Sequence, residues 1–183
     1  VTVDQLQKAK GSGLLYVGGV FGSYKSDKVV SELVSNASIT VNHKKHNDTE
    51  AEHADVLNVG GLFGGLLKAS AKDLVYTGVV NITASNTLYN ANVGLVAGLA
   101  SLASERVVAD AQLTLTTTTD SQTNVYADVY TKYGTWNKYN NVKILNASSL
   151  TIDGNLVDLS GYTQIQNISE VITSEFILSK LVA

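Results

Sequence analysis

The sequence predicts an all-β fold in the form of a parallel β-helix or solenoid, with a β-sandwich as the alternative. Three observations predict it: apolar and polar residues alternate over much of the chain, a glycine-rich motif recurs, and the 183 residues include no proline. Alternation with a period of two is typical of strands that bury one face, and a recurring motif is typical of stacked repeats. Proline is excluded wherever backbone N–H groups pair with the coils above and below.

The start of the chain departs from this pattern and predicts a short helix over residues 1–12. Thr2 and Gln5 have the spacing of a capping box. Apolar residues then recur on one helical face, at Val3, Leu6 and Ala9. We expect this helix to cover the first coil and to block its exposed edge.

The glycine-rich motif defines about three repeats. Val-Gly-Gly-Val-Phe-Gly at residues 17–22 returns as Val-Gly-Gly-Leu-Phe-Gly at residues 59–64 and in degenerate form at residues 93–98. The motifs start 59 − 17 = 42 and 93 − 59 = 34 residues apart. Each is followed by an alternating strand that contains Ile39, Val80 or Leu113, at offsets of 22, 21 and 20 residues. Such similar offsets predict that each motif and its strand form one unit that stacks on the next.

The remaining segments are assigned to the same single domain, residues 1–183. Residues 13–119 form the repeat region, and residues 120–183 form a C-terminal β-rich region that lacks the motif. The polar segment 42–55 interrupts the alternation and predicts an exposed loop. The apolar segment 165–182 fits strand and helix templates equally, so its type stays open. It would cap one end of the stack or pair with another copy.

The motif, its variable polar middle and the following strand resemble the GLUG-motif repeat, which is named for a Gly-Leu-any-Gly core. Residues 19–22 and 61–64 carry the resemblance, residues 94–98 carry it in weaker form, and it covers residues 15–119. It implies a β-solenoid-like fold in a cell-surface or secreted protein. It implies no catalytic residues.

The composition excludes several classes of function. Only 16% of residues are charged, and 13 basic against 16 acidic residues leave a net charge of −3, which argues against a nucleic-acid partner. The absence of cysteine excludes disulfides, thiol nucleophiles and thiolate metal sites. No apolar run approaches the ~20 residues that span a bilayer. Because the chain begins with Val1 and has no signal-like segment, we expect a processed chain or an excised fragment.

The three histidines His43, His46 and His53 are weak candidates for metal ligands. They lie within eleven residues, among carboxylates that also bind transition metals. However, His-x-x-His in a loop does not preorganise a site, so we favour a solvated loop and predict neither metal nor cofactor.

We predict no catalytic residues and no enzyme. Catalysis on a β-helix needs carboxylates gathered on one face of successive coils, alone or with Arg or Lys. The acidic residues look scattered along the sequence: Asp27, Glu32, Asp73, Glu105, Asp110, Asp128, Asp153 and Asp158. Counted from the motif, Asp27 and Asp73 do not share a rung.

Two sets of residues are candidates for surface features. Five Asn-x-Ser/Thr sequons make Asn36, Asn47, Asn81, Asn146 and Asn167 candidates for glycosylation, against the alternative that Asn-rich turns produce sequons by chance. One segment gathers the aromatic residues Tyr126, Tyr130, Tyr133, Trp136 and Tyr139. Such residues stack on sugars or anchor a protein partner, although packing on a strand face explains them as well.

These observations predict an extracellular or cell-surface structural protein, either an adhesin segment or the subunit of a self-assembling fibre. Its expected partner is a second copy, or a cell-surface protein or glycan. A carbohydrate-binding adhesive module is the alternative, and a polysaccharide-active enzyme on a β-helix is less favoured.

Overall fold

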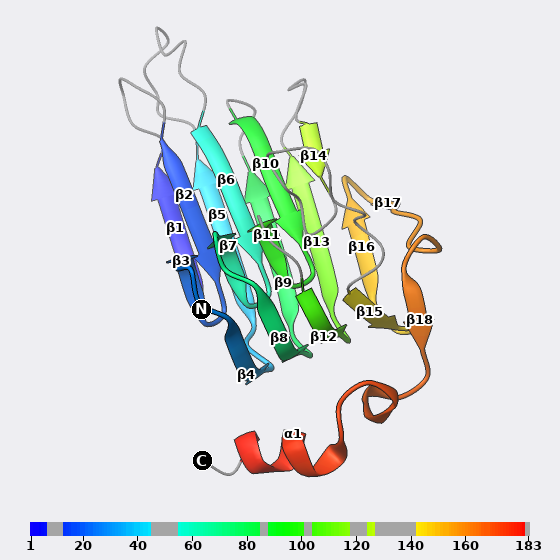
Figure 1. Cartoon of the computed structure of the whole chain (residues 1–183). Coiled ribbons are helices and arrows are strands. Elements are labelled where there is room, and N and C mark those ends of the chain that lie inside the picture. Colours follow the sequence, from blue (N-terminus) through cyan, green and yellow to red (C-terminus); the bar gives the residue numbers. More distant parts are fainter. Residues whose placement is uncertain are drawn as a thin grey trace, which may run out of the picture.

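The computed structural model describes residues 1–6, 13–44, 55–84, 88–100, 104–117, 124–126 and 142–181, most of them in strands (Figure 1). In chain order the strands are β1 (Thr2–Leu6), β2 (Leu14–Gly18), β3 (Phe21–Lys25), β4 (Val30–Ser35), β5 (Ile39–Lys44), β6 (Asp55–Gly60), β7 (Phe63–Leu67), β8 (Ala71–Tyr76), β9 (Val79–Ala84), β10 (Leu88–Gly94), β11 (Ala97–Ala100), β12 (Ser104–Ala109), β13 (Gln112–Thr117), β14 (Asn124–Tyr126), β15 (Val142–Leu145), β16 (Ser149–Ile152), β17 (Asn155–Leu156) and β18 (Thr163–Ile165). A 3₁₀ helix, η1 (Ile168–Glu170), and an α-helix, α1 (Ser174–Leu181), follow them.

The strands form four sheets, and from β1 to β10 each strand pairs with the strand four places further along the chain. Sheet A has the order β1-β5-β9-β13-β16-β17, sheet B β14-β10-β6-β2, sheet C β11-β7-β3 and sheet D β18-β15-β12-β8-β4. Within the described residues every pair is parallel except β16 with β17. The predicted all-β class is therefore confirmed, in the form of parallel sheets.

The recurring motif aligns across neighbouring strands. Val17 is the register partner of Val59, and Val59 that of Val93. In sheet A, Ile39 pairs with Val80 and Val80 with Leu113. The offsets of 22, 21 and 20 residues in the sequence thus correspond to one position in three successive repeats of four strands. We call these repeats units, and they consist of β2–β5, β6–β9 and β10–β13.

The glycines of the motif let two sheets approach closely. A Cβ atom built on Gly64 would lie 2.5 Å from the Gly22 carbonyl oxygen and 2.7 Å from the Tyr16 carbonyl carbon. No side chain fits at such distances, so glycine is needed there for space rather than for an unusual backbone conformation.

The core lies between the sheets and is built from the inward positions of the strands. Strand β9 alternates fully between exposed and buried residues, and its inward residues Val80, Ile82 and Ala84 are buried. Tyr76 is also fully buried, and its hydroxyl donates a hydrogen bond of 2.7 Å to the Ala37 carbonyl oxygen. Burial raises the pKa of Tyr76 to about 12.

The expected N-terminal helix is wrong in the part that the structure describes. Residues 2–6 form strand β1, which pairs in parallel with β5, and residues 7–12 lie outside the described residues. Thr2 and Val3 are β-branched, and Val3 packs against the core. A five-residue helix gains little without packing, whereas the edge of sheet A offers a full row of backbone partners, so pairing overrides the capping signal.

The C-terminal segment, whose type the sequence left open, contains β18, η1 and α1. In Figure 1, α1 crosses below the sheets near β4, which it contacts. Ile172 and Ile165 are buried with Val75 and Val108 in a second apolar cluster, to which Phe176 and Ile177 add partly buried contacts. This segment therefore covers the outer face of sheet D.

The polar segment 42–55 is strand at both ends. Strand β5 continues to Lys44 and β6 begins at Asp55, so the predicted loop is shorter than expected there. Residues 45–54 lie outside the described part of the chain.

Candidate functional site

Sheet D carries a charged cluster on a repeated bend of the backbone. Strands β4, β8 and β12 each skip one residue in their pairing: Glu32, Asp73 and Arg106. Their φ angles are 61°, 56° and 51°, in the left-handed region that non-glycine residues seldom adopt. The same bend in three successive units brings side chains of opposite charge onto adjacent strands.

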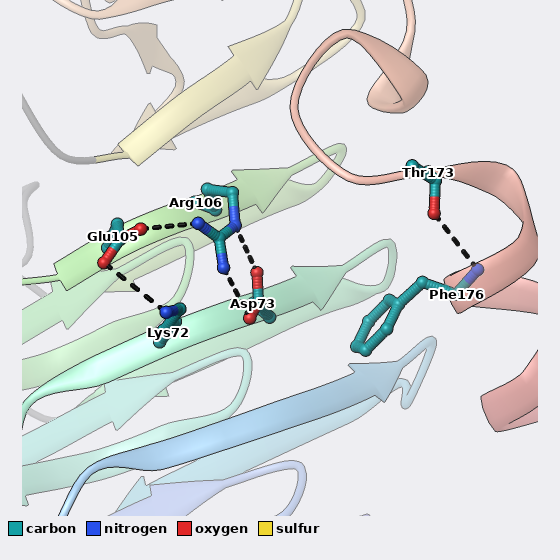
Figure 2. A network of polar contacts seen from close by, with 6 residues as sticks. All are labelled: Lys72, Asp73, Glu105, Arg106, Thr173 and Phe176. Carbon is teal, nitrogen blue, oxygen red and sulfur yellow. Dashed lines mark hydrogen bonds and ion pairs between the residues drawn. The ribbon is translucent and has the colours of Figure 1, made fainter.

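Arg106 is the centre of this cluster (Figure 2). Its Nε and Nη2 atoms donate to the two carboxylate oxygens of Asp73, at 2.5 and 2.8 Å. Its Nη1 atom lies 2.5 Å from a carboxylate oxygen of Glu105, and Lys72 Nζ lies 3.9 Å from the other oxygen of Glu105. Both oxygens of Asp73 are therefore occupied by one guanidinium.

The electrostatics of the cluster fit a structural role better than a chemical one. The hydrogen bonds from Arg106 lower the pKa of Asp73, and the charges of Arg106 and Lys72 act in the same direction. Asp73 is consequently ionised at neutral pH and holds no proton to donate.

Beside the cluster, Figure 2 shows Phe176 pointing from α1 toward the strands, and the backbone N of Phe176 donates a hydrogen bond of 3.4 Å to Thr173 Oγ1.

The cluster corrects one expectation from the sequence. Asp27 precedes β4 and Asp73 lies within β8 beyond the Val30–Ala71 register pair, so the two do not share a rung, but Glu32, Asp73 and Glu105 are not scattered, because they lie on neighbouring strands with Lys72 and Arg106. A constant spacing in the sequence could have revealed this column of charged residues. Glu32, Asp73 and Arg106 each lie seven residues before the aligned residue of the following sheet A strand: 39 − 32, 80 − 73 and 113 − 106.

A second polar feature, buried and also missed from the sequence, lies in sheet B. Asn92 Nδ2 donates to Asn58 Oδ1 at 2.7 Å, and Asn58 Nδ2 donates to the Leu15 carbonyl at 3.3 Å. Asn92 Oδ1 is buried without a hydrogen-bond partner in the described part of the chain. Both asparagines directly precede the valine of the motif, which was the available signal. Stacked amides of this kind link successive strands.

The structure describes one of the three histidines that were weak metal candidates. His43 lies in β5 with 2% of its surface exposed, and His46 and His53 lie outside the described residues. The described ranges contain no group of three or more His, Cys, Asp or Glu side chains able to hold a metal ion.

Four of the five sequon asparagines are described, and all four are exposed. Asn36 lies between β4 and β5, Asn81 on the outward side of β9, and Asn146 in the turn after β15. Asn167 is the N-cap residue of η1, and Asn47 lies outside the described part. Their exposure leaves the side chains accessible to modification, which stays a prediction.

The aromatic segment is the least described of the candidates. Tyr126 is the last residue of β14, and nothing is described of its side chain or of Tyr130, Tyr133, Trp136 and Tyr139. The recognition surface that they were expected to form stays a prediction.

Comparison of the chain with family models, with curated proteins and with solved structures found no match. The resemblance to the GLUG-motif repeat therefore rests on the motif residues alone. Among the described residues, no helix is long and apolar enough to cross a membrane.

Proposed function

We propose that this chain is a β-solenoid with a structural role at the cell surface or outside the cell. The observation that carries the proposal is the register of the repeats. The motif valines Val17, Val59 and Val93 are neighbours in one sheet, and the same four-strand order returns in each unit. One winding chain whose units stack in register explains both the period and the shared core.

The polar features of the described chain also support a structural role. The Arg106 cluster and the asparagine pair both join residues of adjacent units, and Arg106 occupies both carboxylate oxygens of Asp73. Interactions of this kind hold neighbouring units in register. The proposal therefore has no catalytic part.

The resemblance to the GLUG-motif repeat and the exposed sequon asparagines are the support for a surface location. The test is limited proteolysis of intact source cells, followed by detection of the chain with an antibody. We expect loss of the chain from intact cells at a protease dose that spares a cytoplasmic control protein. Protection of the chain until the cells are lysed would reject the location.

The structural role has a separate test in the purified protein. Far-UV circular dichroism should report β-structure, and small-angle X-ray scattering should fit a four-sheet particle in which the six strands of sheet A span about 24 Å, at ~4.8 Å between neighbouring strands. A scattering profile of a two-layer β-sandwich would reject the solenoid. For the carbohydrate-binding alternative, a glycan array on the wild type, Tyr133→Ala and Trp136→Ala is the corresponding test.

A further inference from the structure

The outer face of sheet A presents polar side chains in two regular columns. Its strands β1, β5, β9, β13 and β16 follow one another in the stack (Figure 1). In each strand one inward residue lies between two outward residues. The inward residues pack in or against the core, and they are Val3, Val41, Ile82, Leu115 and Ile152.

The register of the strands aligns the outward residues across the sheet. The residues before the inward ones form the first column, in the order Thr2, Thr40, Asn81, Thr114 and Thr151. The residues after the inward ones form the second column, in the order Asp4, Asn42, Thr83 and Thr116. We call these nine residues the threonine face.

The threonine face is much richer in threonine than the chain as a whole. Six of its nine residues are threonine, whereas 17 threonines in 183 residues predict fewer than one among nine. Threonine is favoured in strands, but the fold does not impose it on every outward row. An aligned row of sheet D consists of Ser31, Lys72 and Glu105. The uniform composition is thus a property of these two columns and not of exposed strands in general.

The two columns also differ from the rest of their own sheet. The outward row next to the first column is mixed, and it consists of Val79, Gln112 and Ser149. The threonine face is therefore a strip that is two residues wide and crosses five strands.

This strip is open to solvent. Asp4, Asn81, Thr83 and Thr116 are exposed, and every other member is exposed or half-buried. The C-terminal segment packs on sheet D instead. A ligand can therefore reach the whole strip without displacing another part of the described chain.

The side chains of the threonine face are held in few positions. Threonine is branched at Cβ, which restricts χ1, so it loses little freedom when it binds. Asn42 Nδ2 donates a hydrogen bond of 2.8 Å to Asp4 Oδ1, which joins two members of the second column. Beside that column, Asp153 accepts hydrogen bonds of 2.5 and 2.7 Å from the backbone N and Oγ1 of Thr117. The surface is therefore organised before any ligand arrives.

The threonine face repeats in two dimensions. Neighbouring strands lie about 4.8 Å apart, and outward residues two places apart along one strand are separated by about 6.6 Å. Hydroxyl and methyl groups consequently recur on a lattice with these two spacings. A ligand that contacts the whole face must itself repeat at similar spacings in both directions.

The chemistry of the face favours ordered water over a macromolecule. Its nine residues include no aromatic side chain on which a sugar would stack or a protein partner would anchor. They include no basic side chain for nucleic acid or anionic lipid. A threonine hydroxyl both donates and accepts hydrogen bonds, as water does. Oxygen atoms on the faces of hexagonal ice repeat in two dimensions at spacings close to those of the threonine face.

We propose that the threonine face binds the surface of ice crystals. Its hydroxyl groups take the places of water molecules in the outermost layer of the crystal, and its methyl groups occupy the spaces between them. This inference goes beyond the structural role proposed above. It depends on the register of sheet A and not on a cell-surface location.

Retention in growing ice tests the proposal. The wild type is produced in a host without N-glycosylation, because a glycan on Asn81 would cover the face. Part of a micromolar solution is then frozen slowly onto a cold surface, and the protein is measured in the ice and in the remaining liquid. Because growing ice excludes ordinary solutes, we expect the wild type to be retained in the ice.

A substitution in the middle of the face supplies the comparison. Thr83→Tyr places a large ring there while keeping a residue that strands favour, and we expect retention to fall at least fivefold. Thr116→Tyr on the neighbouring strand should have the same effect. The matched control is Thr163→Tyr in β18, at an exposed strand residue outside the face, and we expect no change. Circular dichroism shows whether each variant remains folded.

Three results would overturn the proposal. The first is exclusion of the wild type from ice, and the second is equal retention of the wild type and the folded Thr83→Tyr and Thr116→Tyr variants. The third is a wild type that is excluded from ice but binds a polysaccharide on a glycan array, with loss of binding in these variants, which would assign the face to a sugar. All three concern the face, whereas surface proteolysis concerns the location, so the two proposals fail by different measurements.

Discussion

Gly64 offers a direct test of the close contact between sheets B and C, and Gly22 is its matched control. Both glycines occupy the same position of the repeated motif, in β7 and β3. The Cβ atom of Gly64→Ala would meet backbone atoms of Gly22 and Tyr16 at 2.5 and 2.7 Å, and backbone N of Val17 closer still. The Cβ atom of Gly22→Ala would meet the Tyr16 carbonyl oxygen at 3.0 Å and nothing else closer than 3.8 Å.

The expected difference follows from what has to move. At Gly64 the backbones of β2 and β3 must both move away from β7 by roughly half an ångström or more, and overpacking of this kind costs about 1–3 kcal/mol, occasionally more. We expect a loss of about 3 kcal/mol there. At Gly22 one carbonyl must shift slightly, and the smaller conformational entropy of unfolded alanine offsets about 0.4–1 kcal/mol. We expect a net change within about 1 kcal/mol.

Thermal unfolding followed by circular dichroism measures both variants at one protein concentration. For a chain of this size 1 kcal/mol corresponds to roughly 2–4 °C, so Gly64→Ala should lower Tm by about 6–12 °C. Gly22→Ala should change Tm by less than about 4 °C. If the two variants melt at the same temperature, the sheets do not meet at Gly64 as described and the argument fails.

Four other residues, Tyr76, Arg106, Ile172 and Asn81, carry predictions of their own. Tyr76→Phe removes the hydrogen bond to the Ala37 carbonyl and should lower the free energy of unfolding by about 1–2 kcal/mol in urea denaturation. Because the pKa of Tyr76 is raised to about 12 in the folded state, the wild type should lose stability as pH rises from 10 to 12, and Tyr76→Phe should lack that loss. Arg106→Gln should return the lowered pKa of Asp73 toward its ordinary value in an NMR carboxyl titration, and an unchanged pKa would contradict the assigned cause. Ile172→Ala should cost about 2–4 kcal/mol of stability because Ile172 is buried against sheet D, whereas Ser169→Ala at a nearby exposed position should change little. Secretion from a glycosylating host should raise the chain mass above 19.4 kDa, and Asn81→Gln should remove one glycan from that mass, while an unmodified wild-type mass would reject the sequons.

The repeat was the part of the fold most accessible from sequence. Strands Val79–Ala84 and Gln112–Thr117 alternate cleanly because one side faces the core and the other faces away from it, so their period is visible in the residue types. The motif offsets then predicted the register, because stacked units place equivalent residues opposite one another.

The N-terminal strand and the covered face of sheet D were harder to predict for a common reason. Residues 2–6 have a capping-box spacing and apolar residues three apart, Val3 and Leu6, as in a helix, so only the neighbouring edge of sheet A favours a strand. Sheet D strands contain the apolar runs 74–76 and 107–109, which signal burial on both faces, but they do not say what covers the outer face. The charged column is hard to recognise in the sequence because the distance from the motif to the bend varies between repeats, whereas the distance from the bend to the aligned residue of the next sheet A strand is constant.

The position of each strand in its sheet also predicts how the fold opens. Strands with neighbours on both sides lose two sets of contacts when they detach, whereas the edge strands β1 and β2 lose one. Amide hydrogens of β1 and β2 should therefore exchange faster than those of the inner strands, and protection should rise toward β9. Unfolding would then begin with detachment of the N-terminal edge strands and proceed inward, and refolding would extend outward from the middle units.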